Sequence, residues 1–145
     1  MANRESKKRP HERLKVWRDA MDPVEAAYRV SSRCPDSERP GLTSQERRAA
    51  VSVPSNIAKG AARIWLAECV CDLSVARGWL SELDTQRQNV QRPAFVEIDQ
   101  DVDPLIDRLF ARLTAQMKAL MKLVSVAGTS PDFPFPISDS LEHAR

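Results

Sequence analysis

The chain has 145 residues, a formal net charge of +2 and a hydrophobic content of 42%. This length suits a single domain with a substantial core, and no apolar run approaches the ~20 residues of a membrane span. The charged start lacks the apolar centre of a signal peptide. Its three cysteines have no disulfide-like spacing, so we expect a cytoplasmic protein without membrane contact.

Charge is unevenly distributed along the chain. Residues 1–18 hold seven Lys or Arg and two Glu, whereas residues 97–107 hold five acidic residues and no Lys or Arg. We expect residues 1–11 to form a flexible basic arm that can contact phosphates. A solvated tail and an acidic helix start explain the same distribution without any ligand.

The first predicted helix has an apolar stripe at spacings of three and four. The stripe comprises Leu14, Trp17, Met21, Val24 and Tyr28. Pro23 interrupts it, so this helix is either kinked there or restarts with Asp22 as its N-cap. A loop follows, from Cys34 to Gly41.

The second predicted helix starts at Thr43, where Glu46 three residues later would complete a capping box. Pro54 removes one backbone donor and predicts a bend over Ala50–Pro54. Gly60 either ends this helix or allows a neighbouring backbone to approach closely.

Two longer helices are expected next. The third carries an apolar stripe from Leu66 to Leu83, and Gly78 inside it costs about 1 kcal/mol relative to Ala, which predicts a close helix contact. The fourth starts near Asp99–Asp103 and runs to about Val126. Residues 127–145 read as a flexible, proline-containing tail.

Four amphipathic helices with short connections predict an all-α, up-down four-helix bundle over residues 12–126. Some apolar side chains fall outside the stripes that this bundle needs, which predicts self-association. The candidate interface residues are Trp65, Trp79, Phe110, Met117 and Met121.

Two blocks of the chain match a known pattern. The first runs from Gly41-Leu42-Thr43-Ser44-Gln45 through Arg47, Arg48, Pro54, Asn56 and Gly60 to Arg63, and the second covers Ala76-Arg77-Gly78 and Leu80–Gln86. Together with Leu14, Trp17 and Tyr28, they resemble the small four-helix-bundle proteins first recognised as reading frames in 23S ribosomal RNA intervening sequences. The resemblance covers about residues 12–125.

This resemblance implies a ring-shaped homopentamer. Related accessory proteins of diversity-generating retroelements look like basic barrels that bind RNA and a reverse transcriptase. The chain departs from the family pattern at Lys59, where Glu is usual, and at Trp79, where Ser is common. Lys59 adds a cation near Arg63, which favours an anionic partner.

The sequence offers little for catalysis, metals or cofactors. Both histidines lie near the ends, and Cys69 and Cys71 project about 200° apart on a helix, so they cannot easily grip one ion. Ser52 and Ser55 have no histidine nearby in the sequence to activate them. We therefore expect a non-enzymatic protein without a cofactor.

Polar residues of the two blocks have structural interpretations. Asn56 is expected to satisfy carbonyls freed near Ala50 or to bond across the bundle. Arg47 and Arg48 project about 100° apart, and we expect one of them to form a buried pair with Glu82. Phosphate contact is the functional alternative for these arginines.

The leading functional hypothesis is an accessory protein that binds the backbone of RNA or DNA. Its candidate contacts are Arg9, Arg13, Lys15, Arg18, Lys59 and Arg63. The alternative is an oligomeric scaffold that binds another protein and contacts no nucleic acid, which the small net charge favours.

Overall fold

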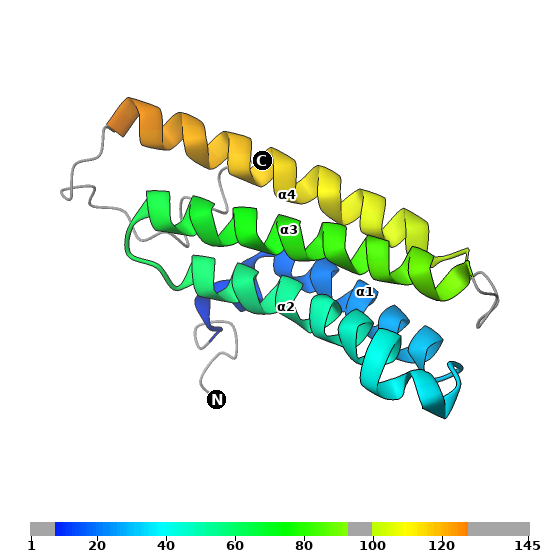
Figure 1. Ribbon diagram of the computed structural model, residues 1–145. Helices are drawn as coiled ribbons and strands as arrows, with labels where there is room; N and C mark the ends of the chain where they lie inside the picture. Colours follow the sequence, from blue (N-terminus) through cyan, green and yellow to red (C-terminus); the bar gives the residue numbers. More distant parts are fainter. Residues whose placement is uncertain (1–7, 93–99, 128–145) are drawn as a thin grey trace, which may run out of the picture.

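The computed structural model describes residues 8–92 and 100–127, and these residues form four antiparallel helices (Figure 1). The helices are α1 (Lys15–Ser31), α2 (Ser44–Ala61), α3 (Leu66–Gln91) and α4 (Val102–Ala127). Short helical turns, η2 (Pro10–Arg13), η3 (Asp36–Glu38) and η4 (Arg39–Thr43), precede α1 and α2. No strand occurs in these two ranges, so the all-α class is confirmed. Residues 1–7 and 128–145, most of the two expected flexible segments, lie outside them.

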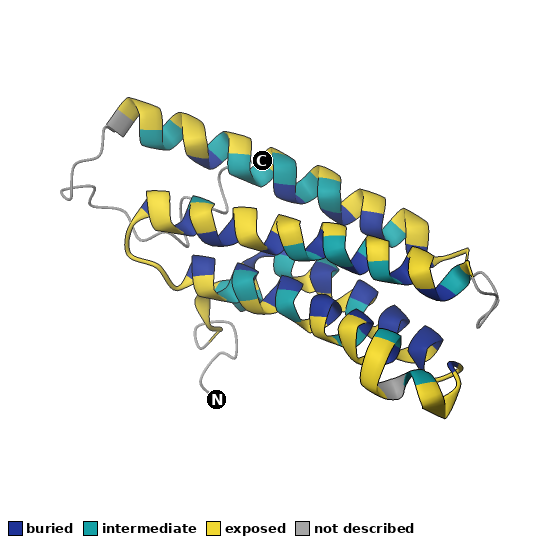
Figure 2. Ribbon diagram, in the orientation of Figure 1, coloured by how far each residue is buried: buried dark blue, intermediate teal, exposed yellow. Residues whose placement is uncertain are grey.

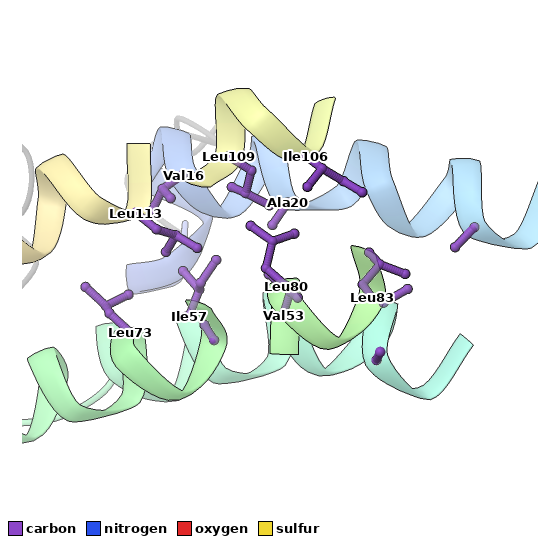
Figure 3. Packing of buried hydrophobic residues seen from close by; sticks show 14 of the residues in the cluster. Val16, Ala20, Val53, Ile57, Leu73, Leu80, Leu83, Ile106, Leu109 and Leu113 are labelled. Atoms are coloured by element: carbon purple, nitrogen blue, oxygen red, sulfur yellow. The ribbon is translucent and has the colours of Figure 1, made fainter. Parts of the chain in front are cut away.

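The core lies along the inward faces of all four helices (Figures 2 and 3). Every member of the predicted third-helix stripe is buried, as are Val102, Ile106, Leu109, Leu113 and Leu120 of the fourth. The side chains at the centre include Val53, Ile57, Leu73, Leu80, Leu109 and Leu113. The three-four periodicity therefore predicted the buried face of α3 and most of that of α4. The stripe predicted for the first helix is wrong in part, because Met21 and Tyr28 are exposed. Helix α1 directs Val16, Ala20 and Val30 toward the core instead.

Helix α1 runs through Pro23 without a restart, and the proline ring is buried. Its missing N–H removes one intrahelical bond, but burial of the ring against the core offsets part of that cost. The alternative with a fresh N-cap at Asp22 is therefore wrong.

The predicted capping box at the start of α2 is also wrong. Thr43 has helical backbone angles of −60° and −46° and makes no side-chain cap bond. The preceding turn η4 leads directly into the helix, so Thr43 is not the extended residue that a capping box needs. Glu46 instead points inward and is fully buried.

Three side chains bond to backbone carbonyls around Pro54. The Ser52 hydroxyl donates to the Arg48 carbonyl, and the Ser55 hydroxyl donates to the Val51 carbonyl, each at 2.7 Å. The amide of Asn56 donates to the Ser52 carbonyl at 2.7 Å. Asn56 thus bonds within its own helix, one turn away, and neither to Ala50 nor across the bundle.

The two glycines predicted to lie in close contacts differ. A Cβ on Gly60 would lie 3.2 Å from both the Cys69 carbonyl oxygen and Asp72 Cβ, so the α2–α3 approach requires glycine there. A Cβ on Gly78 would meet nothing within 4 Å. The predicted helix contact at Gly78 is therefore wrong within the protomer.

Two ion pairs attach α4 to the rest of the bundle. Arg112 pairs with Asp19 of α1, and Asp103 pairs with Arg87 of α3. Arg77 of α3 also donates to the Thr114 hydroxyl at 3.1 Å. From Met121 to Val126, the apolar side chains of α4 are half-buried or exposed, among them Leu123, Val124 and Val126.

Candidate nucleic-acid interface

The antiparallel path gathers the start of α1, the end of α2, the start of α3 and the end of α4 at one end of the bundle (Figure 1). Five of the predicted phosphate-contacting cations lie there with exposed side chains, as does Lys8. We name this group, together with Lys118 and Lys122 of α4, the basic end. Its members are Lys8, Arg9, Arg13, Lys15, Arg18, Lys59, Lys118 and Lys122.

Local hydrogen bonds order the first part of the basic end. The Arg9 backbone N–H donates to Glu12 Oε2 at 2.7 Å, and this bond closes the turn η2. The guanidinium of Arg18 donates to the Glu12 carbonyl at 3.0 Å, so it bonds the end of η2. Because η2 also packs against α2, Arg9 and Arg13 are brought alongside the end that bears Lys59.

Arg63 does not belong to the basic end as a free cation. Its Nε donates to Asp72 Oδ2 at 2.7 Å, and this hydrogen bond and the carboxylate charge raise the pKa of Arg63. The pair neutralises the guanidinium of Arg63, which lies in the connection after α2. Of the two cations predicted near the end of α2, Lys59 therefore offers the available charge.

Lys118 and Lys122 were not among the sequence candidates. Both are exposed on the last turns of α4, four residues apart. Their spacing places them on one face of that helix. They lie on the polar face of α4, opposite the apolar stripe, and this pattern is visible in the sequence.

The expected pairing of Arg47 or Arg48 with Glu82 does not form. The Nε of Arg47 donates to Ser31 Oγ at 2.7 Å, and its guanidinium lies 4.6 Å from the centroid of the Tyr28 ring. The guanidinium of Arg48 lies 5.6 Å from the Trp79 ring centroid. Each arginine thus stacks on an aromatic ring of a neighbouring helix, which holds its charge at the surface.

The predicted interface residues are only partly exposed on the surface of the protomer. Trp79 is half-buried beneath Arg48, and Phe110 is half-buried with Arg77 5.5 Å from its ring centroid. Met117 is half-buried too, whereas Met121 is 54% exposed and Trp65 is 39% exposed. Ile64 and Val126, at 80% and 87%, were not predicted, because each lies outside the helical stripes that periodicity detects.

The described residues offer no group of three His, Cys, Asp or Glu side chains able to hold a metal ion. Cys69 is buried, and burial raises the pKa of its thiol to about 12, whereas Cys71 is exposed. Likewise, no helix within these residues has the length and apolar content to cross a bilayer.

A comparison with protein families identifies the family of this chain. Residues 12–117 match the family described as 23S rRNA-intervening sequence protein. The chain belongs to this family. A search of curated proteins finds no match.

Membership in the 23S rRNA-intervening sequence protein family agrees with the two blocks recognised in the sequence. The matched region begins in η2 and ends in α4, before Lys118. Half of the basic end, namely Arg13, Lys15, Arg18 and Lys59, lies inside the family region, whereas Lys8 and Arg9 precede it and Lys118 and Lys122 follow it.

Proposed function

We propose that this protein is a non-enzymatic, cytoplasmic accessory protein that self-associates and binds the phosphate backbone of RNA or DNA through its basic end. The gathering of cations from α1, α2 and α4 at one end of the bundle carries the proposal. The family name, which refers to 23S ribosomal RNA, adds a weak hint of association with RNA.

The chemistry of the basic end suits phosphates better than bases. Lysine and arginine side chains that neutralise phosphates release counterions, so binding of this kind weakens as salt rises. The exposed aromatic surface here is limited, with Trp65 39% exposed. Backbone-directed binding with little sequence preference follows from these two properties.

Self-association multiplies this charge. A homopentamer, the assembly implied by the resemblance noted above, would present five basic ends to one polyanion. The exposed Met121 and the half-buried Met117 and Phe110 on α4 support a contact between copies.

The first prediction tests the basic end directly. Replacing Arg13 and Lys59 with Glu should abolish binding of a fluorescently labelled single-stranded RNA at moderate salt, because two attractive charges become repulsive. For the unaltered protein, the affinity should fall with salt, with a slope of roughly −0.7 per neutralised phosphate. Fluorescence anisotropy across a salt series, with a duplex DNA in parallel, measures both.

The matched control is Arg108→Glu, a charge reversal at an exposed position on the first half of α4. It should leave binding nearly unchanged, since it lies away from the basic end. Because Arg108→Glu reverses one charge and the basic-end variant reverses two, a loss of binding free energy at least half as large in Arg108→Glu would show that binding depends on total charge alone. An absence of RNA and DNA binding even at low salt would end the proposal.

A protein-binding scaffold is the second candidate function. The exposed apolar side chains of Ile64 and Val126, and the internal neutralisation of Arg63 by Asp72, favour it. Such a scaffold would bind its partner with little dependence on salt, and the Arg13→Glu, Lys59→Glu variant would retain that binding.

A further inference from the structure

A buried cluster of charged side chains lies at the other end of the bundle, where α2 begins, α3 ends and α4 begins (Figure 1). Glu46 is 0% exposed and Arg87 is 3% exposed. Arg87 Nη2 pairs with Asp103, whose side chain is 54% exposed. Three helices therefore meet at one buried guanidinium and one buried carboxyl group.

The hydrogen bonds of this cluster are incomplete. Both carboxyl oxygens of Glu46 are buried and have no hydrogen-bond donor, and Nε and Nη1 of Arg87 are buried without an acceptor. A buried carboxylate without donors is costly, whereas a protonated carboxyl group in the same place costs much less. The geometry at Glu46 therefore favours the neutral form, and Arg87 keeps Asp103 as its partner in either case.

We propose that Glu46, Arg87 and Asp103 form a proton-sensitive joint, at which α2, α3 and α4 hold together more firmly when Glu46 is protonated. The proposal is independent of the proposed function, since this cluster and the basic end occupy opposite ends of the bundle.

The electrostatic surroundings of Glu46 support this joint. Burial raises the pKa of Glu46 from an ordinary value near 4.5 to about 7, against the attraction of Arg87 and then of Arg47. On the connection between α1 and α2, Cys34 lies near both Glu46 and Glu38, and burial raises the pKa of the Cys34 thiol. Ser31 and Tyr28 of α1 contact Arg47, and Asp103 pairs with Arg87. Both cations that act on Glu46 are therefore held by other partners.

The sign of the pH effect follows from linkage. The folded protein binds the Glu46 proton more tightly than the unfolded chain does. This group's contribution to stability is therefore fully present below about pH 4.5 and is lost as pH rises to about 7. Across that interval the unfolding equilibrium constant should rise by up to ~10-fold per pH unit from this group alone.

Urea unfolding from pH 4.5 to pH 8 tests the joint in the full chain. Glu46→Gln mimics the protonated side chain, so it should match the unaltered protein near pH 4.5. At pH 7.5 it should have an unfolding constant lower by roughly tenfold or more, because it lacks the buried charge. Glu25→Gln, at an exposed position of α1, is the matched control and should follow the unaltered protein throughout.

Carboxyl-carbon NMR of the unaltered protein provides a second readout that does not depend on the variant's folding. The Glu46 carboxyl carbon should titrate near neutral pH. A midpoint near 4.5, or parallel stability profiles for Glu46→Gln and the unaltered protein, would overturn the proposal.

Discussion

Gly60 and Gly78 are both helical, yet their surroundings differ completely. Gly60 faces the Cys69 carbonyl of α3, and a carbonyl within a helix cannot move aside without disturbing the backbone. Gly78 faces open space. The same residue type therefore reflects a packing requirement at one position and only a loss of helix propensity at the other.

Alanine at Gly60 should destabilise the protein by about 1–3 kcal/mol, since its methyl group would overfill the α2–α3 contact. Alanine at Gly78, the matched control, should instead stabilise it by about 0.5–1 kcal/mol through helix propensity. Chemical denaturation measures both changes. A destabilising Gly78→Ala in the dissociated protein would point to a contact that the protomer lacks.

At the scale of elements, α4 is bound less evenly than the other helices. Its first half carries both ion pairs and four buried side chains of the core, whereas its last turns have mainly half-buried or exposed apolar side chains. Figure 2 shows this loss of burial along the end of α4. The C-terminal turns of α4 therefore depend least on the protomer's own core.

Hydrogen exchange should reflect this difference. In the dissociated protomer, amides after Leu120 should exchange at least tenfold faster than those of α3 around Leu80, because local opening there exposes little apolar surface. Exchange followed by mass spectrometry measures this. Equal protection of the two segments would mean that α4 opens only with the whole bundle.

Helix positions and the buried faces of α3 and α4 were largely accessible from the sequence, because a stripe such as Leu73, Leu80 and Leu83 repeats at the period of the helix. The buried face of α1 was not, since small residues such as Ala20 face the core there while Met21 is exposed. The start of α2 was predicted within one residue, but its capping was not. Thr43 and Glu46 have the capping-box spacing, but burial of Glu46 beside Arg87 overrides that local pattern. Side-chain partners such as Asp72 for Arg63 depend on how helices meet, and spacing within one helix does not encode this. Five cations of the basic end were predicted individually and Lys8 only as part of the basic arm, whereas Lys118, Lys122 and the neutralisation of Arg63 were not predicted.

For the whole molecule, the proposed self-association involves α4. Met121→Asp should reduce the mass measured by light scattering to that of a protomer, because a charge in an apolar contact between copies is costly. Circular dichroism should remain helical, since Met121 is 54% exposed within the protomer.

Ala115→Asp, at an exposed position of the same helix, is the matched control and should keep the mass of the unaltered protein. If Met121→Asp also keeps that mass, then the contact between copies lies elsewhere.

The antiparallel path has one more consequence. Because the basic end lies at one end of each bundle, copies related by rotation about a single axis would all direct that end the same way relative to the axis. The positive charges of all copies would then form one band, at the outer rim, on one face or around the central channel of the assembly. The ends that contain Glu46 would form a second band. The two sides of the assembly would therefore present different charged groups to solvent and to partners.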